Sequence, residues 1–253
     1  MIDLAYSIFG NGFPLVFLHG YLENRYLWNE FIQNFENNTC ICFDLPGCGE
    51  TPPIEEQTID KMAEAVKYNL DKLNIKNIII IGHSMGGYVS LSFAKNYPDY
   101  LKGLVLMNSH PFADTAEKKQ NRMQEIDLIN IGKKSLLLSN FIQKLYAPDF
   151  NDQEKIEKSR TMAELTCPKG MIACLKAMAN RTDCSEVIHN AKYPILWIYG
   201  KKDQLFNYEL ADNFITQNNR LIKLKLDNVG HMSMYEAKDE VTKALKQFID
   251  LCL

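Results

Sequence analysis

The sequence predicts an α/β protein built around a mostly parallel β-sheet with helices on both faces. Two observations predict this class. Short apolar runs recur along the 253-residue chain, and segments with helical periodicity lie between them. Apolar runs of this kind fit strands that are buried on both faces. Parallel strands also need long crossover connections, which are usually helices.

The apolar runs give the expected strands in order. The strongest is residues 76–81, which holds four consecutive isoleucines before a glycine. Residues 221–226 alternate apolar residues with lysine, which is typical of a strand near the sheet edge. Residues 2–8, followed by Gly10-Asn11-Gly12, predict a hairpin that leads into the first central strand. The remaining strands are expected at residues 14–18, 40–43, 104–107 and 195–199.

Helices are expected between these strands. Residues 58–73 begin at a capping threonine, Thr58, and residues 85–96 stop before Pro98. A last helix is expected at residues 234–252.

The middle of the chain differs from the rest. Residues 112–190 contain no clear strand run. Since strands resume afterwards, this segment is expected to be a helical lid inserted in one α/β core, which comprises residues 1–111 and 191–253. The expected lid helices cover residues 114–130, 133–146, 152–165 and 168–180.

Composition excludes several classes of protein. The net charge is −3 and no basic stripe is present, which argues against a nucleic-acid partner. The apolar runs are too short to cross a bilayer, so no membrane partner is expected. The seven cysteines are odd in number and scattered, and the N-terminal residues lack the pattern of a signal peptide. We therefore expect a cytoplasmic protein with reduced thiols.

The first chemical motif is Gly82-His83-Ser84-Met85-Gly86-Gly87, directly after the isoleucine-rich strand and at the start of a helix. A nucleophile elbow requires this placement, because a sharp turn must project the serine hydroxyl clear of the backbone. Small residues beside the serine make such a turn possible. Ser84 is the expected nucleophile.

A serine hydroxyl needs a base to take its proton and an acid to orient that base. His231 lies in a glycine-bearing loop after the last strand, and we predict that it is the base. Asp203 follows the strand at residues 195–199 and precedes His231, so it is the expected acid. Asp114 is the alternative acid, from the preceding strand.

The negative charge of a tetrahedral intermediate needs hydrogen-bond donors. We expect the backbone N–H groups of Met85 and Tyr21 to form this oxyanion hole. His19, in the same loop as Tyr21, is expected to anchor that loop and to take no part in catalysis.

Together these motifs resemble the α/β-hydrolase superfamily. The resemblance is carried by His19-Gly20 with Trp28, by the loop from Asp44 to Gly49, by the serine motif, and by Gly200-Lys201-Lys202-Asp203 and Gly230-His231. It implies an eight-stranded sheet, a lid inserted after the sixth strand, and neither a metal nor an organic cofactor. Within the superfamily the sequence looks like the small capped group of carboxylesterases, enol-lactonases and C–C hydrolases. Glu50-Thr51 departs from the pattern, in a loop we take as scaffold.

Four functions remain open. The first is hydrolysis of a small carboxylic ester or lactone through an acyl-serine. The second is C–C bond hydrolysis or a lyase reaction, similar to relatives that act on meta-cleavage products or in the menaquinone pathway. Thioester or amide hydrolysis is the third, and a catalytically silent ligand-binding receptor is the fourth. Serine at the nucleophile position argues against haloalkane dehalogenase and epoxide hydrolase chemistry.

The partner we expect is a small-molecule substrate, selected by the lid. Arg122, Arg160 and Arg181 are the cationic side chains that could hold a substrate carboxylate. The residues expected to line the substrate pocket are His110, Arg122, Met123, Phe141 and Met178.

Overall fold

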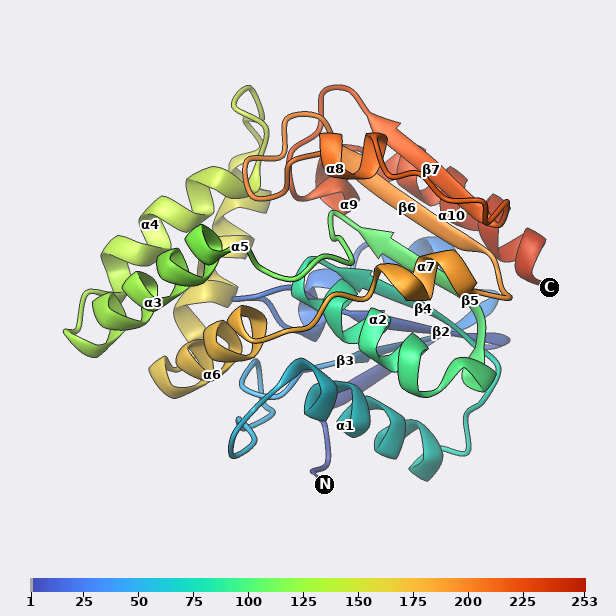
Figure 1. The fold of residues 1–253 in the computed structure, drawn as a ribbon, viewed down its shortest axis with the longest axis horizontal. Helices are drawn as coiled ribbons and strands as arrows, with labels where there is room; N and C mark the ends of the chain where they lie inside the picture. Colours follow the sequence, from blue (N-terminus) through green and yellow to red (C-terminus); the bar gives the residue numbers. More distant parts are fainter. Residues whose placement is uncertain (1) are drawn as a thin grey trace.

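The computed structural model describes residues 2–253. Within these residues one seven-stranded sheet has the order β1-β3-β2-β4-β5-β6-β7 (Figure 1). Neighbouring strands are parallel, except that β1 runs antiparallel to β3. The strands are β1 (Tyr6–Phe9), β2 (Phe13–Leu18), β3 (Asn38–Phe43), β4 (Ile78–His83), β5 (Leu101–Met107), β6 (Ile195–Gly200) and β7 (Leu221–Leu226).

The burial of the strands explains why they could be predicted from apolar runs in the sequence. Every residue of β4 and of β6 is buried, because helices cover both faces of the sheet there. The alternation of apolar residues with lysine predicted an edge strand, and β7 is at the sheet edge. Lys225 is exposed there, whereas Lys223 is partly buried and its Nζ donates to the Asp212 and Phe214 carbonyls. All six strands expected after the opening segment are confirmed.

The expected hairpin at the N-terminus is wrong. Strand β1 pairs with β3 and not with β2, which lies between β3 and β4. Gly10 and Gly12 adopt φ values of 75° and 143°, and a side chain at Gly10 would meet the Asn38 carbonyl. This tight glycine turn therefore carries the chain across the start of β3.

The strand count also differs from the expected eight. In residues 2–253 the sheet has seven strands, so the helical segment follows the fifth strand and not the sixth. The backbone groups of the residues before β1 form hydrogen bonds outside the sheet ladder. The Leu4 N–H donates to the Asn69 side chain, and the Ala5 carbonyl accepts from the Asp44 N–H.

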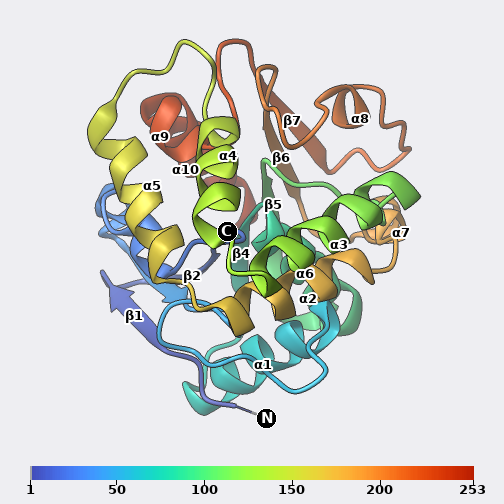
Figure 2. The ribbon, with the colours of Figure 1, turned by 90° about the vertical axis from the view of Figure 1, so that its left-hand side faces the viewer.

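Helices cover both faces of the sheet (Figures 1 and 2). Helices α1 (Ile59–Lys72) and α2 (Met85–Asn96) lie on one face, and α10 (Lys238–Cys252) lies on the other. Thr58 caps α1 by accepting from the Lys61 N–H, as predicted. The expected helix at 234–252 is divided into α9 (Ser233–Glu236) and α10. The break is at Ala237, which leaves the helical conformation (φ −136°, ψ 45°).

Residues 112–190, here called the helical insertion, contain all four predicted helices. Figure 1 shows α3 to α6 beyond the carboxyl ends of the strands, toward which the strand arrows point. The short helix α7 was not anticipated, and it lies against α2. The bounds are α3 (Ala116–Asn130), α4 (Lys134–Leu145), α5 (Gln153–Leu165), α6 (Pro168–Ala179) and α7 (Ser185–Asn190).

Four short helical turns complete the chain: η1 (Arg25–Trp28), η2 (Ile32–Phe35), η3 (Pro98–Tyr100) and α8 (Glu209–Asp212). Across residues 2–253, no helix is both long enough and apolar enough to traverse a bilayer.

Candidate active site

Ser84 occupies the turn between β4 and α2 with φ 50° and ψ −116°. This conformation is rare for a residue with a side chain, so the surroundings must hold it. The Ser84 N–H donates to the Met107 carbonyl, and the Ser109 hydroxyl donates to the Ser84 carbonyl at 2.7 Å. A side chain at Gly82 would lie 2.4 Å from the Gly86 carbonyl oxygen. A side chain at Gly86 would lie 2.2 Å from the Leu18 carbonyl oxygen, so both glycines are needed for this tight turn. A nucleophile elbow requires such a turn.

His231 and Asp203 are in direct contact. His231 Nδ1 lies 2.7 Å from Asp203 Oδ2, so Nδ1 donates to the carboxylate, and Nε2 has no hydrogen bond to the described residues. The other oxygen of Asp203 accepts from the N–H groups of Leu205 and Phe206. Burial alone would raise the pKa of Asp203, but His231 and these donors outweigh burial and lower it.

The loop that carries His231 is fixed from several sides. The Asn108 side-chain amide donates both to Asp203 Oδ2 at 3.1 Å and to the Gly230 carbonyl at 2.9 Å. The buried Glu236 carboxylate accepts from the N–H groups of Gly230 and Met232. These contacts fix both neighbours of His231. Asn108 and Glu236 were missed by sequence reasoning, because neither belongs to a recognisable motif.

The helical insertion also contacts this loop. The His231 N–H donates to the Leu145 carbonyl at the end of α4, and Glu236 accepts from the Ala147 N–H. The orientation of His231 therefore depends on the insertion as well as on the sheet.

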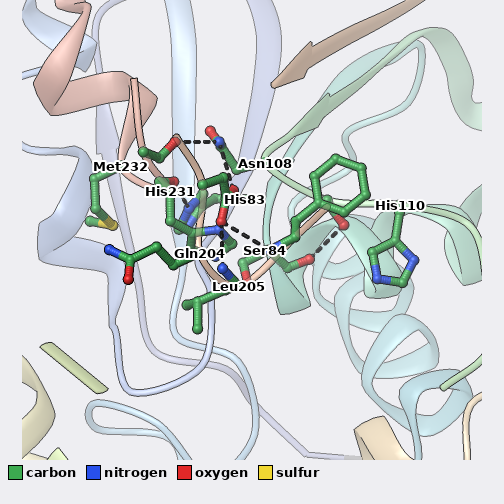
Figure 3. Close-up of polar contacts among 12 residues, drawn as sticks. His83, Ser84, Asn108, His110, Gln204, Leu205, His231 and Met232 are labelled. Atoms are coloured by element: carbon green, nitrogen blue, oxygen red, sulfur yellow. Dashed lines mark hydrogen bonds and ion pairs between the residues drawn. The ribbon is translucent and has the colours of Figure 1, made fainter. Parts of the chain in front are cut away.

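Ser84 is flanked by a second buried histidine. His83 lies immediately before it, and the His83 ring centroid is 4.9 Å from that of His231. Since His83 is the last residue of β4, Ser84 and His231 lie at the same edge of the sheet. Figure 3 shows His83, Ser84 and His231 gathered at the centre of the view, with His110 on the other side of Ser84.

The loop after β2 contains the predicted donor Tyr21. His19 in this loop accepts from the Leu45 N–H and donates to the Gly20 carbonyl, which confirms that it anchors the loop. Tyr21 is buried, and its ring meets the ring of Phe141 from α4 edge to face at 5.7 Å. The other predicted donor, Met85, is the first residue of α2. Its N–H therefore lies at the positive end of that helix.

Asp114, the alternative acid, has different partners. It forms ion pairs with Arg122 and with Arg181, at 2.5 and 2.7 Å, and all three side chains are largely buried. Burial would raise the pKa of Asp114, but the two guanidinium groups outweigh it and lower the pKa. Asp114 is thus committed to the helical insertion, whereas Asp203 holds the histidine.

His110 lies in an aromatic stack. Its ring packs between Phe112 and Phe206, with centroids 5.7 and 5.2 Å away. Burial, and secondarily the charge of Arg181, lower the pKa of His110 to about 3. With Tyr88 and Arg181 it lines a cavity of about 90 Å³ between α1, α2 and the end of α6.

The other predicted pocket residues occupy different environments. Met178 is buried inside the insertion, and its carbonyl accepts from Arg181. Met123 is 48% exposed, because it lies on a side of α3 that faces solvent. Arg160 pairs with Glu157 on the same helix and remains partly exposed. Phe141, by contrast, contacts the loop after β2 through Tyr21.

The described residues hold no cluster of three or more His, Cys, Asp or Glu side chains arranged to bind a metal. The seven cysteines are free thiols.

Comparisons with known proteins agree with this geometry. The model of the alpha/beta hydrolase fold family matches residues 14–126. A 2-succinyl-6-hydroxy-2,4-cyclohexadiene-1-carboxylate synthase from Enterobacter is 25% identical over 95% of this chain and 93% of its own. A thermophilic esterase from Thermogutta terrifontis superposes with a TM-score of 0.93 at 27% identity, over 98% of this chain and 93% of the esterase. An enol-lactonase from Burkholderia xenovorans gives a TM-score of 0.85 at 21% identity, over 98% and 96% of the two chains.

The sheet order, the turn at Ser84 and these likenesses define the class of protein. The chain has the alpha/beta hydrolase fold. The similar proteins include an esterase and a synthase, so the class alone does not select a reaction.

Proposed function

We propose that the protein is a serine hydrolase that cleaves a small carboxylic ester or lactone through an acyl-serine intermediate. One observation carries the proposal. The strained turn presents Ser84 at the sheet edge where His231 is already oriented by Asp203, with Nδ1 protonated and Nε2 free. A nucleophile beside a free imidazole nitrogen is what acyl transfer requires.

The reaction proceeds in two half-reactions. His231 Nε2 takes the Ser84 proton while Ser84 Oγ attacks the carbonyl carbon. The resulting oxyanion accepts hydrogen bonds from the N–H groups of Met85 and Tyr21. His231 then gives the proton to the departing alkoxide, which leaves an acyl-serine. Water, deprotonated by the same nitrogen, releases the acid and returns the proton to Ser84.

Asp203 acts on the base and not on the substrate. Its carboxylate keeps the proton of neutral His231 on Nδ1 and stabilises the imidazolium that forms during attack. Asn108 and Glu236 hold the loops on either side of this contact.

We also propose that residues 112–190 act as a cap on the α/β core of residues 1–111 and 191–253, and that the cap selects a small-molecule substrate. Two contacts support this role. Phe141 packs on Tyr21, and α4 ends against His231. A substrate that reaches Ser84 would therefore lie under the insertion. We expect the enzyme to act in the cytoplasm.

The test is hydrolysis of p-nitrophenyl esters of increasing acyl length by the wild type and by Ser84→Ala. We expect turnover of acetate or butyrate that falls to background in the variant, with little change in thermal stability. Equal turnover by the two proteins would contradict the proposal.

A second candidate is a lyase or C–C bond reaction on the same catalytic residues. The observation that favours it is the likeness to synthases of 2-succinyl-6-hydroxy-2,4-cyclohexadiene-1-carboxylate, which extends over nearly the whole chain. In that reaction His231 would take a proton from carbon through Ser84, and no acyl-enzyme would form. A folded protein that hydrolyses none of the esters would favour this candidate, or a silent receptor if a ligand raises the melting temperature without turnover.

A further inference from the structure

A buried carboxylate and a buried imidazole meet directly behind Ser84. Glu23 Oε2 lies 2.9 Å from His83 Nδ1, and both side chains are almost fully buried. The same oxygen accepts from the Gly20 N–H at 2.6 Å. A methyl group placed on Gly20 would lie within 3.0 Å of Glu23 Oε2, His83 Nδ1 and Ser84 Cβ. The pair is therefore packed against the nucleophile itself.

The hydrogen bonds of His83 limit where its protons can be. Nε2 lies 2.9 Å from the carbonyl oxygen of His231, and a carbonyl only accepts, so Nε2 carries a proton. Nδ1 faces a carboxylate oxygen that already accepts from Gly20. The simplest arrangement puts a second proton on Nδ1, which makes His83 an imidazolium and Glu23 a carboxylate.

His19 shows the opposite arrangement in the same loop. Its Nε2 accepts from the Leu45 N–H and its Nδ1 donates to the Gly20 carbonyl, so this ring is neutral. Burial lowers the pKa of His19. Burial acts on His83 in the same sense, but Glu23 and the His231 carbonyl outweigh it and raise the pKa of His83. For Glu23, burial raises the pKa and His83 outweighs it, so the pKa is lowered.

We propose that Glu23 and His83 form a charged pair whose positive end lies beside His231, and that this charge opposes the addition of a second proton to the His231 ring. His83 and Glu23 are thus positioning residues, since they act through His231. This role rests on the proposed function of His231 as the base. The pair is a dipole, and His83 contacts the His231 backbone whereas Glu23 lies behind it.

The pair also joins three parts of the site. Glu23 holds the Gly20 N–H of the oxyanion loop, His83 precedes the nucleophile, and His83 Nε2 holds the carbonyl of the base. The charged and titratable groups around His231 come from five segments. They are Asp203 after β6, His83 at the end of β4, Glu23 in the loop after β2, Glu236 on α9, and Lys118 on α3, whose charge acts on Asp203. Of these groups, the variant Glu23→Gln changes only the charges of Glu23 and His83.

The first measurement needs no substrate. In protein labelled with ¹⁵N-histidine and assigned through backbone connectivity, we expect both ring nitrogens of His83 to remain protonated from pH 5 to 8. We expect His19 to carry a proton only on Nδ1 throughout the same range. A His83 ring with an unprotonated nitrogen at pH 7 would overturn the proposal, whatever the protein turns over.

The second measurement compares Glu23→Gln with the wild type. Without the carboxylate, His83 loses its second proton, and the positive charge beside His231 disappears. The pH at which the His231 ring is half-protonated should then rise by about one unit. A positive charge roughly 5 Å away at an effective dielectric constant of about 20 would account for roughly 2.4 units, and the carboxylate behind it cancels part of this effect. Asp114→Asn is the matched control, because it removes another buried carboxylate with cationic partners.

The same shift should appear in kinetics. The acidic limb of kcat/KM for a p-nitrophenyl ester should move to higher pH by about one unit in Glu23→Gln and stay in place in Asp114→Asn. If Glu23→Gln does not fold, His83→Gln is the second variant and should move the limb in the same direction. A uniform loss of rate or stability with no movement of the limb or of the His231 titration would show a purely structural pair. Absence of ester hydrolysis alone would count against the proposed function. The titrations of His83 and His231 would then decide whether the charged pair exists and acts on His231.

Discussion

At Ser84 the polypeptide stores strain that a flexible loop could not hold. A non-glycine residue at φ near 50° costs about 1–3 kcal/mol, and the bonds to Met107 and Ser109 maintain it. If Ser84 is the nucleophile, as we propose, its backbone is already in the required conformation before a substrate binds. His231 is prepared in the same way by Asp203.

His110 makes a residue-level prediction about pH and stability. Its pKa is about 3 in the folded protein and about 6.5 in an unfolded chain. Between these values the unfolded state binds more protons, so the free energy of unfolding should fall as pH drops from about 6.5 toward 3. His110→Phe keeps the aromatic stack and removes the titrating group. Its unfolding free energy should therefore fall less steeply than that of the wild type, by on the order of 1 kcal/mol per pH unit.

Urea unfolding at pH 7, 6, 5 and 4 measures this difference. His189→Phe is the control, because that ring is exposed and stacks on Phe214. Parallel curves for wild type and His110→Phe would show that His110 is protonated in the folded protein.

Some residues of the site could be predicted from the sequence and others could not. Ser84, Asp203 and His231 were predictable because each lies in a turn after a strand, in a fixed chain order. Whether they catalyse the reaction stays a prediction. The sequence did not predict the roles of Glu23, Asn108 and Glu236. Their hydrogen-bond partners lie at least three residues away, and most lie far along the chain. A carboxylate within the otherwise buried segment 15–25 was the one available sign of Glu23.

At the scale of elements, helix α6 is held to the core by two glycines in contact. A side chain on Gly170 would lie 2.0 Å from the Gly47 carbonyl oxygen, in the loop after β3. Because that obstacle is backbone, Gly170→Ala should push α6 away and lower the free energy of unfolding by about 1–3 kcal/mol. Urea unfolding measures it. Lys169→Ala, at an exposed position of α6, should change stability by no more than about 0.5 kcal/mol. Equal stability of Gly170→Ala and the wild type would contradict this packing.

Strands and helices with a strong hydrophobic periodicity were predicted, whereas features that depend on contacts between distant residues were not. The buried strands β2 to β6 and the helices α1 to α6 all appear where apolar runs and helical periodicity place them. The pairing of β1 was missed, since β3, its partner, is about thirty residues further along the chain. The division between α9 and α10 was missed because it depends on hydrogen bonds between Glu236 and the His231 loop. No local sequence pattern indicates these bonds.

For the whole molecule, the sheet brings the loops after β2, β4, β5, β6 and β7 to one edge. Ser84 lies at this edge together with the contacting pair Asp203 and His231. The helical insertion lies over that same edge (Figures 1 and 2). Under the proposed function, the sheet would supply the catalytic residues and the insertion would supply the surface that a substrate contacts. This division explains why one fold serves esterases, lactonases and synthases.

The most direct test of the central claim is covalent labelling by a fluorophosphonate, which reacts with an activated serine, followed by mass spectrometry of the peptides. We predict one adduct, on Ser84, in the wild type. Labelling should slow by about four orders of magnitude in Asp203→Asn, with little change in Asp114→Asn. An adduct on another residue, or a rate that depends on Asp114 and not on Asp203, would contradict the account.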